Sequence, residues 1–246
     1  MRAGRGRALA VGWSAALVAI LVFVSLGTWQ LGRQQHKQAL LDASTRVLQA
    51  RAAVPLESAA DVARQREYDW SAGAGRFADA PAILLDNQQR HGRAGVRVYR
   101  AFLPDASDAV PVLVELGWVP MPPNRQLPAI GAAPAWADVQ GLLAPPPAAG
   151  LAAPAIQPQP DGSLMLLALD TGAVREALGL PALAPRVLRA DPELQGGYPR
   201  DLEILANTLP PERHLGYAVQ WYGFAAVTLA IALILTLRRP RRRSAS

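Results

Sequence analysis

The chain has 246 residues, 51% apolar content, a formal net charge of +6 and no cysteine, which excludes disulfides, thiolate metal sites and redox cysteine pairs. Three arginines lie before residue 8 and five after residue 237, so the basic charge sits in two short tails and the rest of the chain is slightly acidic. Nucleic-acid binding needs a basic face on a folded domain, so this distribution argues against it and is typical of membrane topology.

The first predicted element is a transmembrane helix over residues 8–28, after a cytoplasmic basic tail over residues 1–7. Its 21 residues carry no charge, and Arg33 and Lys37 follow it. A cleaved signal peptide is the alternative, but the apolar core of such a peptide has about 7–15 residues, and no A-x-A cleavage site follows here. We therefore expect an uncleaved anchor. Seven residues before the span are too few for an amphipathic mitochondrial presequence, which favours a bacterial protein.

Residues 29–213 are expected to form an extracytoplasmic α+β domain. A helical rhythm runs on from Trp29 to Ala53, and Pro55 is expected to end it. Along this helix, Gln30, Arg33 and Lys37 follow one another at spacings that predict a shared face.

Alternating apolar and polar residues then predict a mainly antiparallel sheet. The expected strands are residues 68–77, 82–86, 96–101, 110–115, 139–143, 163–169 and 186–189. A polar turn is expected at 91–93, and a short helix at 171–178 with Asp170 or Thr171 as N-cap and Gly179 as C-cap. Residues 120–160 hold 11 of the 22 prolines and are expected to be mostly extended loop. Whether the sheet closes into a barrel-like form is left open.

The second predicted transmembrane helix covers residues 214–237, and a basic cytoplasmic tail over 238–246 follows it. Leu215 to Leu237 is uncharged, and 23 residues make a helix of about 35 Å, enough to cross a hydrocarbon core of about 30 Å. Basic tails at both ends predict that both termini lie in the cytoplasm and the central domain outside it. The sequence therefore predicts an α+β membrane protein, in which two antiparallel transmembrane helices flank a mainly β domain with a few short helices.

A single histidine stands at the outer edge of the second span. His214, Tyr217, Ala218 and Trp221 recur at helical spacing and predict one polar and aromatic face. One imidazole cannot hold a bare zinc ion, which needs three or four protein ligands, whereas a porphyrin brings four nitrogens and needs one or two more. The alternative is an interfacial histidine beside a Trp/Tyr belt with no ligand at all.

Catalytic motifs do not emerge from the sequence. It contains no G-x-S-x-G, no H-E-x-x-H and no P-loop, and its scattered carboxylates suggest no acid–base pair. His36 and His91 are expected to be surface histidines. No enzyme is predicted, and a membrane-anchored hydrolase with an unfamiliar site remains only a third alternative.

Four stretches, in this order, resemble a known family. They are Gly27-Thr28-Trp29-Gln30-Leu31-Gly32-Arg33 with Lys37, Leu84-Leu85-Asp86-Asn87 with Gly95-Val96, Gly117-Trp118-Val119-Pro120, and His214-Leu215-Gly216-Tyr217-Ala218-Val219-Gln220-Trp221-Tyr222. Together with the two spans, they are similar to the surfeit-locus cytochrome c oxidase assembly proteins. The chain departs from that pattern where Glu115-Leu116 replaces the family's usual arginine, and where Tyr222 replaces a phenylalanine.

The resemblance implies a biogenesis factor of the bacterial inner membrane, with a periplasmic main domain and no catalytic cofactor. It implies transient binding of haem a and its insertion into the catalytic subunit of cytochrome c oxidase, with that subunit, other assembly factors and the lipid bilayer as partners. The resemblance makes His214 the axial ligand of the haem iron. We add, as our own inference, Tyr217 and Trp221 as walls of the site, and Arg33 as a propionate partner that two antiparallel helices would place at similar depth. The alternative is a cofactor-free membrane scaffold for oxidase subunits.

Overall fold

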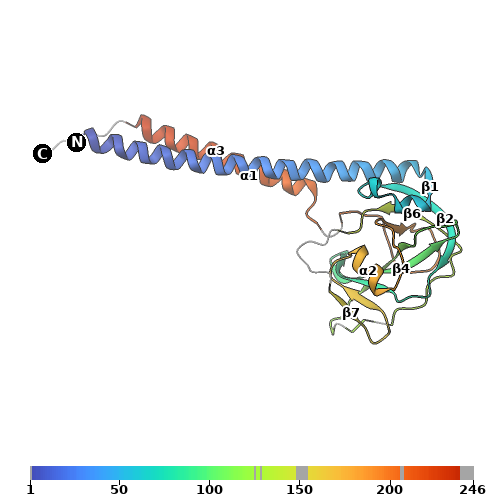
Figure 1. Ribbon diagram of the computed structural model, residues 1–246. Coiled ribbons are helices and arrows are strands. Elements are labelled where there is room, and N and C mark those ends of the chain that lie inside the picture. The colour runs from blue at the N-terminus through green and yellow to red at the C-terminus, as the bar shows by residue number, and fades with distance from the viewer. Residues whose placement is uncertain (1, 125, 128, 148–154, 206–207, 239–246) are drawn as a thin grey trace. The chain divides into compact units, whose positions relative to one another are not determined.

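The computed structural model describes residues 2–124, 126–127, 129–147, 155–205 and 208–238, without side-chain detail before residue 6 (Figure 1). The chain divides into two compact units. One unit combines residues 1–40 with residues 208–246, and the other comprises residues 41–207. All but the first residue of the cytoplasmic tail predicted over 238–246, and part of the proline-rich loop predicted over 120–160, lie outside the described residues.

The first unit consists of two long helices. Helix α1 spans Arg2–Ala50, of which the first part belongs to this unit, and helix α3 spans Pro211–Leu237. Both are long and apolar enough to cross a membrane, which supports a membrane protein. Helix α3 has Pro211 in its first turn, where the missing N–H and the fixed φ of proline suit a helix start.

The two helices pack antiparallel, side by side (Figure 1). Residues early in α1 contact residues late in α3, and residues further along α1 contact its beginning. From one end to the other, the contacts join Trp13 with Thr236, Phe23 with Trp221, Thr28 with Tyr222, and Gln30 with His214. The antiparallel helix pair predicted from the sequence is therefore confirmed.

Helix α1 ends earlier than predicted. Its last residue is Ala50, and Arg51 takes a left-handed conformation with φ of 42°, which stops the helix four residues before Pro55. The Arg51 guanidinium stacks over the Trp70 ring at 4.6 Å and pairs with Asp191 at 3.3 Å, so contacts within the second unit hold this turn. Ala53, which was expected to be the last residue of the helical pattern, begins a short strand instead.

The second unit is built on one sheet, with nine strands among the described residues. These are β1 (Ala53–Pro55), β2 (Asp69–Phe77), β3 (Ile83–Arg90), β4 (Arg93–Pro104), β5 (Val112–Pro120), β6 (Asp138–Ala144), β7 (Ile156–Pro158), β8 (Leu164–Leu166) and β9 (Val187–Ala190). The strand order is β1-β2-β6-β9-β5-β4-β3-β8-β7. Only β1–β2, β3–β8 and β5–β9 are parallel pairs, so the mainly antiparallel sheet is confirmed.

Strands β2 and β4 also pair over three residues, so the sheet folds back on itself without forming a regular barrel. The predicted turn at 91–93 is a two-residue hairpin between β3 and β4, with positive φ at His91 and Gly92, as a type I′ turn requires. Short helices η1 (Leu56–Ala60), η2 (Val62–Arg64) and α2 (Thr171–Ala177) complete the unit. Asp170 caps α2 by accepting from the Ala173 N–H, as one of the two predicted N-caps.

Two apolar clusters line opposite faces of the strands. Leu84, Val98 and Leu116 belong to the larger cluster, and their neighbours Leu85 and Tyr99 belong to the other, as the two-residue period of a strand requires. The second cluster takes in Val174 of α2. Glu115 and Arg97 lie among these core strands and are buried as well, so this sheet carries ionised groups in its interior.

Candidate functional site

His214 lies near the start of α3, on the face that packs against α1. The buried residues of α3 are Pro211, His214, Ala218 and Ala225, spaced at three, four and seven as one helix face requires. The His214 side chain is only 7% exposed, and its Nδ1 lies 2.8 Å from Oε1 of Gln30 on α1. The predicted ligand is therefore held between the two helices by a residue that the sequence analysis did not nominate.

This hydrogen bond bears on which ring nitrogen carries the proton. An amide oxygen only accepts, so the contact favours the neutral tautomer in which Nδ1 of His214 donates and the lone pair lies on Nε2. Nε2 is buried, and no residue that the structure describes forms a hydrogen bond with it. A buried imidazole nitrogen with a free lone pair is the chemical group that an axial iron ligand needs.

Two cations lie near this imidazole. Lys37 is buried, with 7% of its surface exposed, and its Nζ donates to the carbonyl oxygen of Leu209 just before α3. Arg33 is exposed, and both residues are close enough for their positive charges to act on His214. Two positive charges favour the binding of anionic groups, such as carboxylates, beside the histidine.

The face predicted for Gln30, Arg33 and Lys37 is only partly shared. At about 100° per residue, Lys37 lies about 20° from Gln30 around the helix, whereas Arg33 lies about 60° away. Gln30 and Lys37 therefore contact α3 and the segment leading into it, while Arg33 is exposed to solvent.

The aromatic residues proposed as walls lie in different surroundings. Trp221 is seven residues after His214, about 10 Å along the same face, and its ring stacks on Phe23 of α1 with centroids 5.7 Å apart. Tyr217 is 38% exposed and, three residues after His214, lies about 60° from it around the helix. The structure thus brings Trp221 onto the face of His214 and leaves Tyr217 at its edge.

A close helix contact lies one turn before Gln30. A Cβ added at Gly27 would meet Cε1 of Tyr222 at 2.9 Å, so only glycine admits this ring without displacement. The Tyr222 hydroxyl also lies 3.1 Å from Oγ1 of Thr28. Gly27 therefore sets how closely the helices approach beside His214, and its place in a helix interior was the signal that could have revealed it.

A family model described as the SURF1 family matches residues 17–226. The chain belongs to the SURF1 family. Proteins of this family are known in general as cytochrome oxidase assembly factors. The chain is also similar to a SURF1-like protein of Monosiga brevicollis, with 27% identity over 237 residues, covering 91% of this chain and 86% of that protein. The family match includes Gln30, Lys37 and His214 and the parts of α1 and α3 on which they lie.

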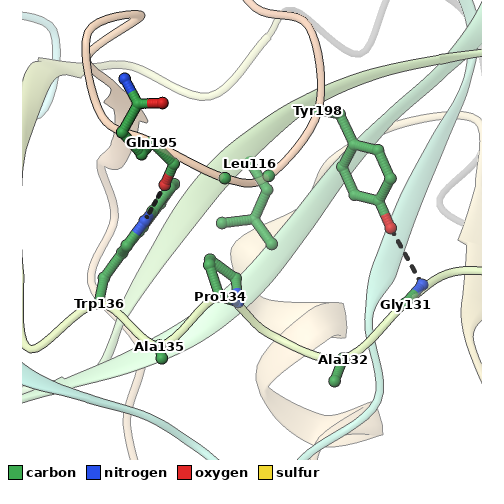
Figure 2. Close-up of a pocket in the computed structure, with 10 residues that line it drawn as sticks. Leu116, Gly131, Ala132, Pro134, Ala135, Trp136, Gln195 and Tyr198 are labelled. Carbon is green, nitrogen blue, oxygen red and sulfur yellow. Dashed lines mark hydrogen bonds between the residues drawn. The ribbon is translucent and has the colours of Figure 1, made fainter.

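The sheet unit of this SURF1 chain has a cavity of about 500 Å³, and the residues that line it are drawn as sticks in Figure 2. Two of its lining residues already use their polar groups. Trp136 Nε1 donates to the Gln195 carbonyl at 2.6 Å, and the Tyr198 hydroxyl accepts from the Gly131 N–H at 3.1 Å. Leu116 also lines this cavity and contributes an apolar part of its wall. The side chains lining it provide no nucleophile–base pair.

Buried charges in the sheet unit form a network that sequence reasoning missed. The Glu115 carboxylate accepts from Arg97 at 2.7 Å, from Arg189 at 3.2 Å and from the Tyr99 hydroxyl at 3.2 Å. Burial and the nearby carboxylate raise the pKa of Tyr99 well above its ordinary value, so the hydroxyl stays protonated and donates. Every oxygen of Glu115 is used inside the protein, which makes this cluster structural.

The network extends to Asp201 near the end of the sheet unit. Its carboxylate lies 2.9 Å from Arg90 and 3.6 Å from Arg189. Burial alone acts to raise the pKa of Asp201, but the hydrogen bond from Arg90 and the charges of neighbouring arginines outweigh it and lower that pKa overall. Among the described ranges, no group of three metal-ligating side chains gathers.

Proposed function

We propose that this chain transiently binds haem a through His214 and assists its insertion into the catalytic subunit of cytochrome c oxidase, without catalysing a reaction itself. Membership of a family of oxidase assembly factors supports the general role. The observation that carries the finer proposal is the buried Nε2 of His214, whose lone pair has no partner among the described residues.

The residues around His214 fit a haem. Bound haem a contributes an iron centre that takes one or two axial ligands beyond its four porphyrin nitrogens. His214 supplies one such ligand, Trp221 and Tyr217 supply aromatic surface, and Arg33 and Lys37 supply positive charge for the propionates. A single protein ligand suits a carrier, because the cargo must leave by breaking one coordination bond.

Burial of His214 sets a condition on loading. Only 7% of the residue is exposed, and Nε2 itself is inaccessible, so the side chains around it move aside before a ligand reaches the nitrogen. In the haem-free state the helix pair therefore keeps its ligand away from water and from other metals.

The proposed location is the inner membrane of a bacterial cell. Helices α1 and α3 are both long enough to span it, and the arginine-rich ends predict that both termini lie in the cytoplasm. The sheet unit then lies in the periplasm, where the oxidase subunit, other assembly factors and the bilayer surface are its partners.

The test is the haem content of full-length protein purified in detergent from cells that make haem a. We expect a haem a spectrum from the wild type and its loss in His214→Ala. His36→Ala is the matched control, since His36 is exposed on α1 and should leave the haem content unchanged. Equal haem in His214→Ala and the wild type would remove His214 as the ligand.

A cofactor-free scaffold for oxidase subunits is the second candidate. The observation that favours it is that a buried histidine, hydrogen-bonded across two helices, also serves as an ordinary helix–helix contact. The scaffold predicts a haem-free protein, from haem a-producing cells, that still co-purifies with the oxidase. Haem in the wild-type protein that is lost in His214→Ala excludes it.

A further inference from the structure

Gln30 makes the only hydrogen bond to the imidazole of His214 found in the part of the chain that the structure describes. Its amide oxygen faces Nδ1 at 2.8 Å, from a different helix and from 184 residues away in the chain. We propose that Gln30 is a positioning residue, which holds His214 as the Nδ1-protonated tautomer and aims the lone pair of Nε2 at the ligand site. Its use for haem rests on the proposed function, whereas the tautomer itself can be measured without haem.

The surroundings of Nε2 support this tautomer. The opposite tautomer would place a proton on Nε2, where a buried N–H would find no acceptor among the described residues, while Nδ1 would face an acceptor oxygen. Buried N–H groups without an acceptor are rare, because their desolvation is not compensated. Both ring nitrogens therefore favour the proton on Nδ1.

Contacts between the two helices, before and after Gln30 in the chain, fix the position of its side chain. Three residues earlier, Gly27 receives the ring of Tyr222. Seven residues later, the Nζ of Lys37 donates to the carbonyl oxygen of Leu209. These contacts hold α1 and α3 in register, so the amide of Gln30 reaches the same ring nitrogen each time the helices pair.

An amide suits a carrier better than a carboxylate would. Partners that accept from a ligating imidazole fix its orientation and make it a stronger ligand, and a carboxylate does so more strongly than a neutral amide. Gln30 therefore fixes the geometry of His214 while keeping the iron–nitrogen bond weak enough to break. Replacing Gln30 with Glu should keep the tautomer and slow haem release.

The direct test is nitrogen NMR of haem-free, full-length protein labelled at histidine nitrogen, in detergent, at a pH where the ring is neutral. His214→Ala identifies the His214 signals by their loss. We expect a protonated Nδ1 and an unprotonated Nε2 in the wild type and in Gln30→Glu. In Gln30→Leu, and in Gln30→Met as a second variant of similar length, the proton should shift substantially to Nε2.

Gln35→Leu is the matched control, because Gln35 is an exposed glutamine on the same helix. It should leave the His214 signals unchanged. A wild-type protein with its proton on Nε2, or folded Gln30→Leu and Gln30→Met variants with unchanged His214 signals, would overturn the proposal.

Haem retention gives the second readout. Loss of a hydrogen-bonding partner behind a metal ligand typically weakens binding by about 10–100-fold, so we expect haem loss from Gln30→Leu to be faster by about that factor. If His214→Ala keeps all its haem, the proposed haem ligand fails, but the NMR result on Gln30 still stands or falls on its own. If His214 binds haem and Gln30→Leu holds it as tightly as the wild type, Gln30 has no positioning role toward haem.

Discussion

Loss of the Glu115 carboxylate should strongly destabilise the sheet unit. This carboxylate is buried and balances two guanidinium groups, Arg97 at 2.7 Å and Arg189 at 3.2 Å, while Tyr99 donates a third hydrogen bond. In Glu115→Gln the shape is kept, but both arginines lose their shared anion inside the protein. Breaking a buried ion pair from one side costs about 3–5 kcal/mol, mostly because the remaining charge stays buried without compensation.

For a unit of this size, each kcal/mol shifts Tm by about 2–4 °C, so the expected loss is roughly 6–20 °C. Thermal unfolding of the full-length protein in detergent, followed by the β-sheet signal in circular dichroism, measures it. Glu193→Gln is the control, because Glu193 is exposed and only reaches Arg51 at 3.5 Å; its pair should contribute about 1 kcal/mol or less. A Glu115→Gln protein that unfolds within about 2 °C of the wild type would refute the reasoning.

Three further results are expected. The lowered pKa of Asp201 means that the folded state holds its proton less tightly than the unfolded chain, so this carboxylate stabilises the protein at neutral pH and that contribution is lost as pH falls below about 5. Asp201→Asn should therefore lose less stability than the wild type between neutral pH and acid; an unchanged slope in acid titrations of unfolding would contradict this. Gly27→Leu should clash at the helix contact and lower the haem content of the purified protein several-fold. Gly32→Leu, at a glycine with open space around it, should leave the haem content unchanged. Equal losses in the two variants would show that the helix contact does not determine haem content. Lys37→Gln should weaken retention of haem a about tenfold, as for a lost hydrogen bond between charged groups, but should have a clearly smaller effect with haem whose propionates are esterified; the same loss with both haems would exclude Lys37 as a propionate partner.

Local patterns predicted most of the sheet and both long helices. Strands β3 and β4 and the turn between them follow from alternation and from a two-residue His91-Gly92 turn, because such signals act over a few residues. Strands β1 and β7 escaped prediction. The residues of β1 follow a helical pattern, β7 lies in the segment expected to be extended loop, and each becomes a strand only by pairing with a neighbour, β2 or β8. The buried contacts of Glu115 could not be predicted either, because its partner Arg189 lies 74 residues further along the chain.

In the candidate site, too, some residues could be predicted from the sequence and others could not. His214 and Trp221 were predictable because their helical spacing places them on one face, and the structure keeps them there. Gln30 was not, because the sequence places it with Arg33 and Lys37 and does not say which of the three meets the second helix. The choice is made by the angle around α1 and by the close approach at Gly27, which are properties of the helix pair.

The unsatisfied nitrogen of His214 also bears on the choice between carrier and scaffold. A buried polar atom without a hydrogen bond destabilises a protein by about 1–3 kcal/mol, and a leucine at this position would pack between two apolar helices without that cost. A scaffold would use His214 as a helix–helix contact through Nδ1 alone and would gain nothing from the unpaired Nε2. Under the proposed function, a ligand on Nε2 would satisfy this atom, and the stabilisation that the empty protein lacks would add to the affinity for the cargo. A single ligand is held in place by an uncharged partner and is inaccessible in the haem-free protein. This arrangement is the one expected of a protein that must bind haem and then release it.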